Sequence, residues 1–175
     1  MAKKVAVLAV NPVNGAGLFQ YLETFFENGI PFRTFAVAET PHIRTNSGVE
    51  LTLEDTIAHL KGHESEYDAV VFSCGDAIPR FAEQAAAPYN QDMLSVLRCF
   101  GKAGKWLIGH CAAALIFDKC GILSGSRVAV HPLAKPAIQQ GIATDAEIEI
   151  DGRVLTARDE KYLPVLMPHL IATLQ

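Results

Sequence analysis

The sequence predicts an α/β fold: a mostly parallel sheet with helices on both of its faces. Segments with strand and helix patterns alternate over roughly the first 120 residues, which is the order of parallel strands joined by helical crossovers. The expected strands are continuous apolar runs, such as Val5–Val10, and such runs are typical of a sheet that is buried on both sides.

Local patterns place the individual elements. Apolar runs predict strands at residues 5–10, 32–37, 68–73, 105–109 and 127–130. Helical spacing predicts helices at residues 18–26, 79–84, 91–103, 112–119 and 162–174. Two hairpins are expected, one at residues 41–51 and one joining 147–150 to 153–156 through Asp151-Gly152. Thr52-Leu-Glu-Asp55 has the pattern of a capping box and predicts that a further helix begins there.

Length and composition limit the classes of function. The 175 residues suit one domain, residues 1–175, and a hydrophobic content of 50% is enough for a sizeable core. The net charge of −4 and the scattered basic residues argue against nucleic-acid binding. No apolar stretch is long enough to span a membrane and no secretion signal is present, so we expect a cytoplasmic protein. The four cysteines have no metal-binding spacing, and we expect neither a metal nor a cofactor.

The main candidate for chemistry is a cysteine at a sharp corner. In Ile108-Gly-His-Cys-Ala-Ala-Ala114 a strand runs into a helix with almost no loop, and Cys111 stands between them. This is the pattern of a nucleophile elbow, a tight turn that lifts a reactive side chain above the sheet edge. The N–H groups at the start of the helix favour a thiolate. The alternative is that Cys111 is only a small buried residue.

Three loops, at residues 11–17, 74–79 and 109–112, leave the carboxyl ends of expected strands and should meet in one crevice. Backbone N–H groups of Gly75 and Ala112 would form an oxyanion-binding pair there. The alternative for Gly75 is a turn that only requires positive φ.

Two histidines are candidate proton-transfer residues. His131, at a strand end, is a candidate base or orienting group for the thiolate. His110 is the second candidate, although neighbouring residues at an elbow usually point in different directions. A structural role is the alternative for each histidine.

Four stretches together resemble the ThiJ/PfpI superfamily over nearly the whole chain. They are residues 4–30, Asp68–Gly75, Ile108–Ala114, and Val128–Lys135 with Asp151–Arg158. The resemblance implies a flavodoxin-like three-layer sandwich, related to class I glutamine amidotransferase domains. It places Cys111 at the reactive cysteine and Gly75 and Ala112 at the N–H donors. His131 matches a histidine that lies near that cysteine in the DJ-one branch.

The sequence also departs from the family pattern. The family usually has a glutamate at the start of the first helix, hydrogen-bonded to the cysteine, but Asn14-Gly-Ala-Gly17 contains no acid and Glu23 comes about two turns later. Ala112 stands where PfpI-type proteases carry a histidine, and Cys74 replaces the first of two glycines. Candidates to replace the glutamate are His110, Asp76 and Asp159.

The resemblance implies a cysteine-dependent enzyme, of hydrolase, protease or glyoxalase-like type. Its substrates would be small carbonyl, amide or peptide compounds. The alternative is a non-catalytic redox, stress-response or chaperone-like protein that uses Cys111 as an oxidation sensor. A third possibility is a scaffold with a vestigial site. The family also implies a homodimer or larger homo-oligomer, with a small-molecule substrate and no nucleic-acid or membrane partner.

Overall fold

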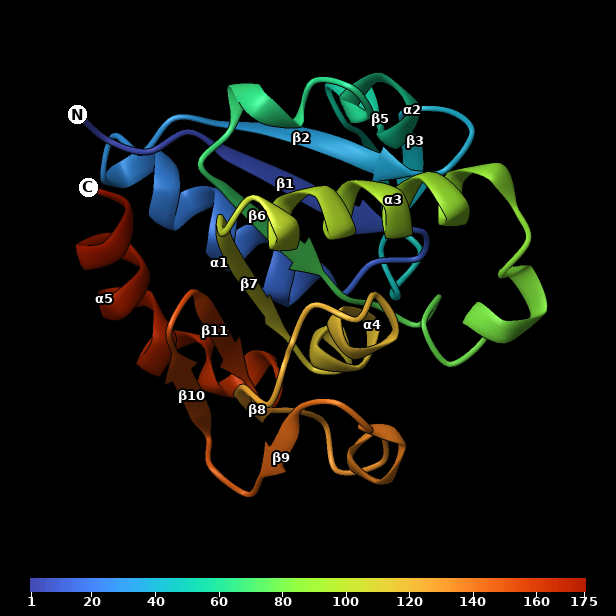
Figure 1. Ribbon diagram of the computed structural model, residues 1–175. Coiled ribbons are helices and arrows are strands. Elements are labelled where there is room, and N and C mark those ends of the chain that lie inside the picture. The colour runs from blue at the N-terminus through green and yellow to red at the C-terminus, as the bar shows by residue number, and fades with distance from the viewer.

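A computed structural model describes residues 1–175 and contains a sheet of seven strands (Figure 1). Their order is β10 (Ile148–Asp151), β11 (Val154–Ala157), β7 (Trp106–His110), β6 (Ala69–Ser73), β1 (Val5–Val10), β2 (Phe32–Val37) and β5 (Asp55–Thr56). Every neighbouring pair is parallel except β10 and β11, which form the expected hairpin.

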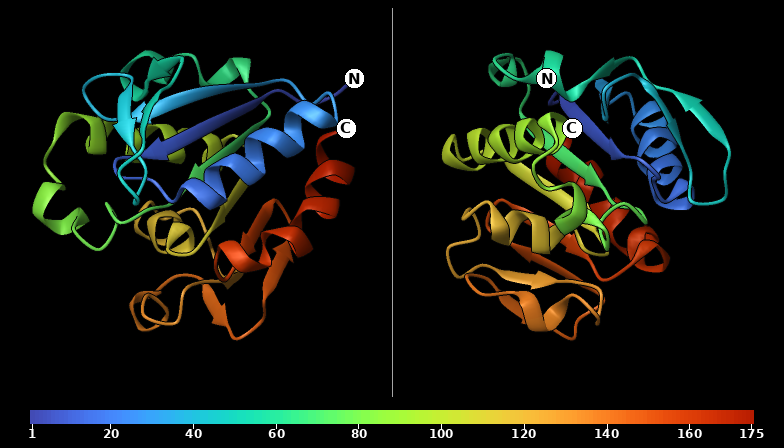
Figure 2. Two further views of the ribbon diagram at one scale, coloured as in Figure 1. Left: turned by 180° about the vertical axis from the view of Figure 1, so that it is seen from behind. Right: turned by 90° about the vertical axis from the view of Figure 1, so that its right-hand side faces the viewer.

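Helices cover both faces of this sheet, which confirms the predicted fold class. The helices α1 (Gly15–Glu27) and α5 (Leu163–Leu174) lie on one face, and α3 (Pro88–Lys102) and α4 (Ala113–Lys119) lie on the other (Figure 2). The short α2 (Ile57–Leu60) packs beside α3. All six residues of the central strand β1 are buried, which explains its continuous apolar sequence. No helix has both the length and the apolar character that crossing a membrane requires.

Two small sheets flank the large one. The strands β3 (His42–Arg44) and β4 (Glu50–Thr52) form the antiparallel hairpin that the sequence predicts. The strand β8 (Arg127–Ala129) pairs in parallel with β9 (Ile142–Thr144), a three-residue strand too short to show a periodic pattern. The strand β8 of this pair lies beside β10 and β11. His131 follows two residues after the end of β8.

The prediction of a helix that begins with a capping box at Thr52–Asp55 is wrong. The helix α2 begins only at Ile57, and the preceding residues form the edge strand β5. Glu54 does not cap a helix, because its carboxylate accepts a hydrogen bond from the N–H of Thr34 (2.8 Å) and its own N–H donates to the Thr34 hydroxyl (3.1 Å). These bonds to β2 hold the segment extended. The helix expected at residues 79–84 is also only a 3-10 turn, at Phe81–Gln84.

A buried carboxylate on α4 anchors the loop that precedes β9. Asp118 is 5% exposed and accepts hydrogen bonds from the N–H groups of Gln139, Gln140 and Gly141, at 2.8–2.9 Å. Asp118→Ala leaves these three donors without their acceptor, so we expect the free energy of unfolding to fall by roughly 3 kcal/mol.

Urea unfolding measures this loss. The control is Glu50→Ala, which removes an exposed ion pair with Arg44 and should change stability by less than about 1 kcal/mol. Equal unfolding midpoints for the two variants would contradict the anchoring role of Asp118.

Candidate active site

Cys111 stands at the corner between β7 and α4. Its φ of 59° lies in the left-handed region, which residues other than glycine rarely adopt. The corner is tight: a Cβ on Gly109 would lie 2.4 Å from the Cβ of Ala113, so only glycine fits there. The chain thus has the geometry of a nucleophile elbow, with a strained residue between a strand and a helix.

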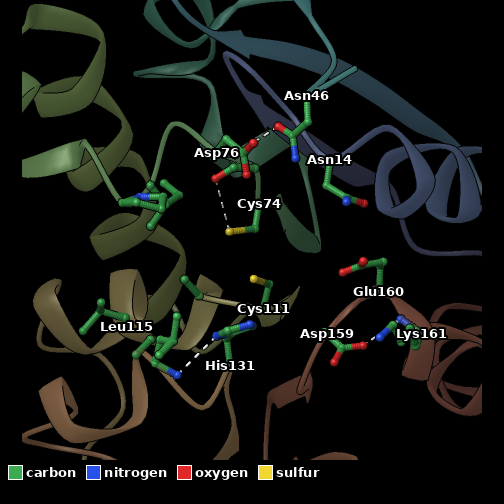
Figure 3. Close-up of a pocket in the computed structure, with 16 residues that line it drawn as sticks. Asn14, Asn46, Cys74, Asp76, Cys111, Leu115, His131, Asp159, Glu160 and Lys161 are labelled. Atoms are coloured by element: carbon green, nitrogen blue, oxygen red, sulfur yellow. Dashed lines mark hydrogen bonds between the residues drawn. The ribbon is translucent and has the colours of Figure 1, made fainter. Parts of the chain in front are cut away.

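The elbow opens into a cavity of about 560 Å³, a size usual for small-molecule sites. The three loops expected at this edge of the sheet, residues 11–17, 74–79 and 109–112, all contribute side chains or backbone to the cavity lining (Figure 3). The lining residues are Asn14, Asn46, Cys74, Gly75, Asp76, Ile78, Pro79, Cys111, Ala112, Leu115, His131, Leu133, Ala134, Asp159, Glu160 and Lys161. The parallel topology therefore places Cys111, His131, Asp76, Gly75 and Ala112 around one cavity, as expected.

The main influence on the Cys111 thiol is a second cysteine. Cys74 follows β6, is 1% exposed and faces the same cavity (Figure 3). The Cys74 side chain lowers the pKa of Cys111 most, and the N–H of Ala112 lowers it further against the effect of burial. The pKa of Cys74 is raised by Cys111 and by burial, and its thiol lies at the carbonyl of Gly75 (4.0 Å). Of the two thiols, Cys111 is therefore the one that ionises more readily.

Two carboxylates act against this thiolate. Glu160 and Asp159 line the cavity, and their negative charges raise the pKa of Cys111, although less than the other groups lower it. The Asp159 side chain accepts a hydrogen bond from the N–H of Lys161 (2.9 Å), which begins the turn leading to α5. Asp159 thus does not stabilise the thiolate, as a replacement for the family glutamate would.

Removing one of these charges should lower the pKa of Cys111 and so favour its thiolate form. We expect Glu160→Gln to move the pH midpoint of Cys111 alkylation to a lower value, because loss of a nearby negative charge lowers the pKa of a thiol. Glu27→Gln, which neutralises an exposed carboxylate at the end of α1, is the matched control and should leave the midpoint in place. A midpoint that stays constant or rises in Glu160→Gln would contradict this electrostatic arrangement.

The two predicted oxyanion donors lie beside the sulfur atoms. Neither the N–H of Gly75 nor that of Ala112 donates to an oxygen acceptor within the protein. Both N–H groups lower the pKa of Cys74, and the N–H of Ala112 also lowers that of Cys111. Since no oxygen of the protein accepts from either N–H group, both remain available beside the two cysteines.

Gly75 is a glycine because another loop lies against it. Its φ is not positive, so the alternative interpretation of a positive-φ turn is wrong. A Cβ at this position would lie 2.2 Å from the carbonyl oxygen of Pro12, 2.5 Å from Cα of Val13 and 2.8 Å from the backbone nitrogen of Asn14. The absence of a side chain allows the 11–17 loop to close this side of the cavity.

His131 is fixed below Cys111. Its backbone N–H donates to the backbone carbonyl of Cys111 (2.9 Å), and its ring Nδ1 accepts a hydrogen bond from the backbone N–H of Leu133 (3.2 Å). A neutral imidazole whose Nδ1 accepts must carry its proton on Nε2. This tautomer suits a proton donor to a bound substrate, and the role of base or orienting group for the thiolate stays a prediction for His131.

His110 is buried outside the cavity, which argues against the catalytic role that the sequence suggests for it. Its ring points to α1, where Nδ1 shares a hydrogen bond with the Tyr21 hydroxyl (3.1 Å) and Nε2 has no partner. Burial lowers the pKa of His110 to about 4. A Cβ on Gly17 would lie 2.5 Å from the Nε2 atom, so this ring occupies the space of a side chain at the start of α1.

Asp76 lines the cavity but is exposed, and its N–H donates to the Asn46 side chain (3.0 Å). It does not contribute to the pKa shift of Cys111, and nothing in its contacts gives it the role of the family glutamate. No group of three or more His, Cys, Asp or Glu side chains is close enough to hold a metal ion.

Sequence reasoning missed Cys74 and Glu160. The signal for Cys74 was present in the strand register: Phe72 pairs with Gly109, and Cys74 and Cys111 each come two residues after that pair, at the same edge of the sheet. This register depends on tertiary structure, since the two strands are 32 residues or more apart in the chain. No comparable signal exists for Glu160, whose position depends on the turn before α5.

Comparisons with known proteins agree with this fold. The model of the DJ-1/PfpI family matches residues 3–173. Protein ppBat of Bacteroides thetaiotaomicron is 61% identical over the full length of both chains. A crystal structure from the same species, of a protein provisionally named protease I, has a TM-score of 0.99 at 61% identity and covers 99% of this chain and 100% of its own.

A more distant structure is a cysteine-to-alanine mutant of a DJ-1 superfamily protein from Salmonella typhimurium. It is 24% identical, has a TM-score of 0.84, and covers 98% of this chain and 90% of its own, so it bears on the fold alone. Together with the family model over almost every residue, these likenesses establish that the chain belongs to the DJ-1/PfpI family.

Proposed function

We propose that the protein is a cysteine-dependent enzyme in which Cys111 attacks a carbonyl carbon of a small carbonyl, amide or peptide compound. The observation that carries this proposal is the convergence at Cys111 of a lowered thiol pKa, two free backbone N–H groups and an open cavity. The provisional name protease I of the 61% identical relative is consistent with amide or peptide substrates.

The groups around the cavity suit each step of such a reaction. The Cys111 thiolate forms a C–S bond as the carbonyl π electrons move to oxygen. The N–H groups of Gly75 and Ala112 bind the resulting oxyanion. When the oxyanion collapses and the C–N bond of an amide breaks, Nε2–H of His131 supplies the proton that the leaving nitrogen needs. Water then releases the acyl group from sulfur and restores the thiol.

Turnover tests the proposal. Purified protein is offered a small α-dicarbonyl compound and a chromogenic peptide amide, each in parallel with Cys111→Ser as the control. Turnover of either substrate that depends on Cys111 supports the proposal. If Cys111 alkylates readily but neither substrate reacts, the proposal fails and the redox alternative is favoured.

A second candidate, an oxidation sensor, is favoured by one specific observation. The side chain that lowers the pKa of Cys111 most is a cysteine, and not a carboxyl group, so one cavity contains two thiols.

A further inference from the structure

Two cysteines lie at matching ends of neighbouring strands. Ser73 ends β6 and His110 ends β7, so Cys74 and Cys111 are each the first residue after their strand. The parallel register ends with Phe72 opposite Gly109, so Cys74 and Cys111 each come two residues after the last paired residue of their strand. Neighbouring strands lie about 4.8 Å apart, and disulfides join Cα atoms separated by roughly 4.4–6.8 Å.

The side chains also face one cavity. Both cysteines line it, the Cys74 thiol lies at the carbonyl of Gly75 (4.0 Å), and each cysteine shifts the pKa of the other (Figure 3). The other two cysteines lie outside this cavity: Cys99 is exposed on α3, and the buried Cys120 thiol donates to the carbonyl of Leu94 (3.8 Å). Cys74 and Cys111 are thus the one pair of thiols that the fold brings together.

The two sulfur atoms differ in access. Cys74 is 1% exposed, whereas Cys111 is only partly buried and opens to the cavity. A small oxidant that enters the cavity therefore meets Cys111, and Cys74 lies behind it, protected from direct oxidation.

We propose that Cys74 is a resolving cysteine, which closes an intramolecular disulfide with Cys111 after a hydroperoxide has oxidised Cys111. The inference rests on the reactive Cys111 of the proposed function and adds a reversible off state to it. The disulfide would remove the nucleophile from the carbonyl reaction until a thiol reductant restores it.

The chemistry is balanced in two steps. The Cys111 thiolate attacks the distal oxygen of the peroxide, the O–O bond breaks, and Cys111 becomes a sulfenic acid; the leaving alkoxide or hydroxide takes a proton from solvent to give an alcohol or water. The Cys74 sulfur then attacks the Cys111 sulfur, the S–O bond breaks, and the departing hydroxide takes the Cys74 proton to form water. The raised pKa of Cys74 slows only this second step, in which the attacked sulfur lies in the same cavity.

Peptide mapping tests the proposal, because each cysteine falls in its own tryptic peptide: residues 62–80, 99–102, 106–119 and 120–127. The protein is treated with hydrogen peroxide, digested without reductant and examined by mass spectrometry. We expect peptides 62–80 and 106–119 to appear joined, with two hydrogens lost, and to separate again after dithiothreitol.

The variant Cys74→Ser should lose this product and gain another. Without a resolving thiol, the Cys111 sulfenic acid persists and takes up a second oxygen to give sulfinic acid. Cys120→Ser, the same change at another buried cysteine remote from the cavity, should still form the disulfide. Near-ultraviolet circular dichroism confirms that both variants are folded, and Cys74→Ala serves if the serine variant is not.

Equal sulfinic acid yields in the wild type and Cys74→Ser, with no joined peptides, would overturn the proposal. Alkylation of Cys111 before oxidation separates this failure from that of the proposed function. Fast alkylation without a disulfide removes only the resolving role of Cys74. An unreactive Cys111 removes both proposals.

Discussion

Cys111→Ser is expected to reduce turnover of carbonyl or amide substrates by on the order of 10³-fold or more, while the fold stays intact. A serine hydroxyl is not ionised at neutral pH, and the Cys74 thiol cannot convert it into an anion. The free N–H groups of Gly75 and Ala112 remain and supply only residual catalysis. Steady-state kinetics on whichever substrate the wild type turns over gives the measurement.

The matched control for Cys111→Ser is Cys99→Ser, the same exchange at an exposed position outside the cavity. It should retain wild-type turnover. If Cys111→Ser retained more than about a tenth of the wild-type rate, attack by the thiolate could not be the rate-determining chemistry.

Gly75→Ala is the second change with a large expected effect. The new Cβ would collide with backbone atoms of Pro12, Val13 and Asn14 at 2.2–2.8 Å, and backbone cannot rotate out of the way as a side chain does. We expect a loss of about 1–3 kcal/mol in the free energy of unfolding. The shift of the Gly75 N–H away from the nucleophile should also lower turnover by about 10²-fold.

Gly15→Ala is the matched control, because its new Cβ would approach only the Thr45 side chain, at 3.1 Å, and no backbone atom. It should change stability little, since alanine also favours the helix that begins there. Unfolding and turnover are measured on both variants. Equal turnover in the wild type and Gly75→Ala would exclude the Gly75 N–H as an oxyanion donor.

The sequence predicts the fold and the centre of the site because both depend on local patterns. Apolar runs locate the central strands, and the strand–cysteine–helix junction locates the elbow. The rule that parallel strands share one functional edge then brings Gly75, Ala112 and His131 around Cys111.

Other features depend on tertiary contacts that no local pattern carries. The segment before α2 resembles a capping box, yet Glu54 bonds to Thr34 of β2 and the chain stays extended. His110 is adjacent to the nucleophile in sequence but packs against Tyr21 on the other side of the sheet. The sequence suggests His110, Asp76 or Asp159 in place of the family glutamate, whereas the side chain that lowers the pKa of Cys111 most is Cys74.

The central claim is that Cys111 is an activated thiolate, and the pH dependence of alkylation tests it most directly. Wild-type protein is treated with iodoacetamide across a range of pH, and the modified peptide is identified by mass spectrometry. The thiol of free cysteine has a pKa of about 8.5. We predict that Cys111 reacts first, with a midpoint clearly below that value, while Cys74 and Cys120, whose pKa values are raised, react last. A Cys111 midpoint at or above that of free cysteine, or faster reaction at any other cysteine, would contradict the account.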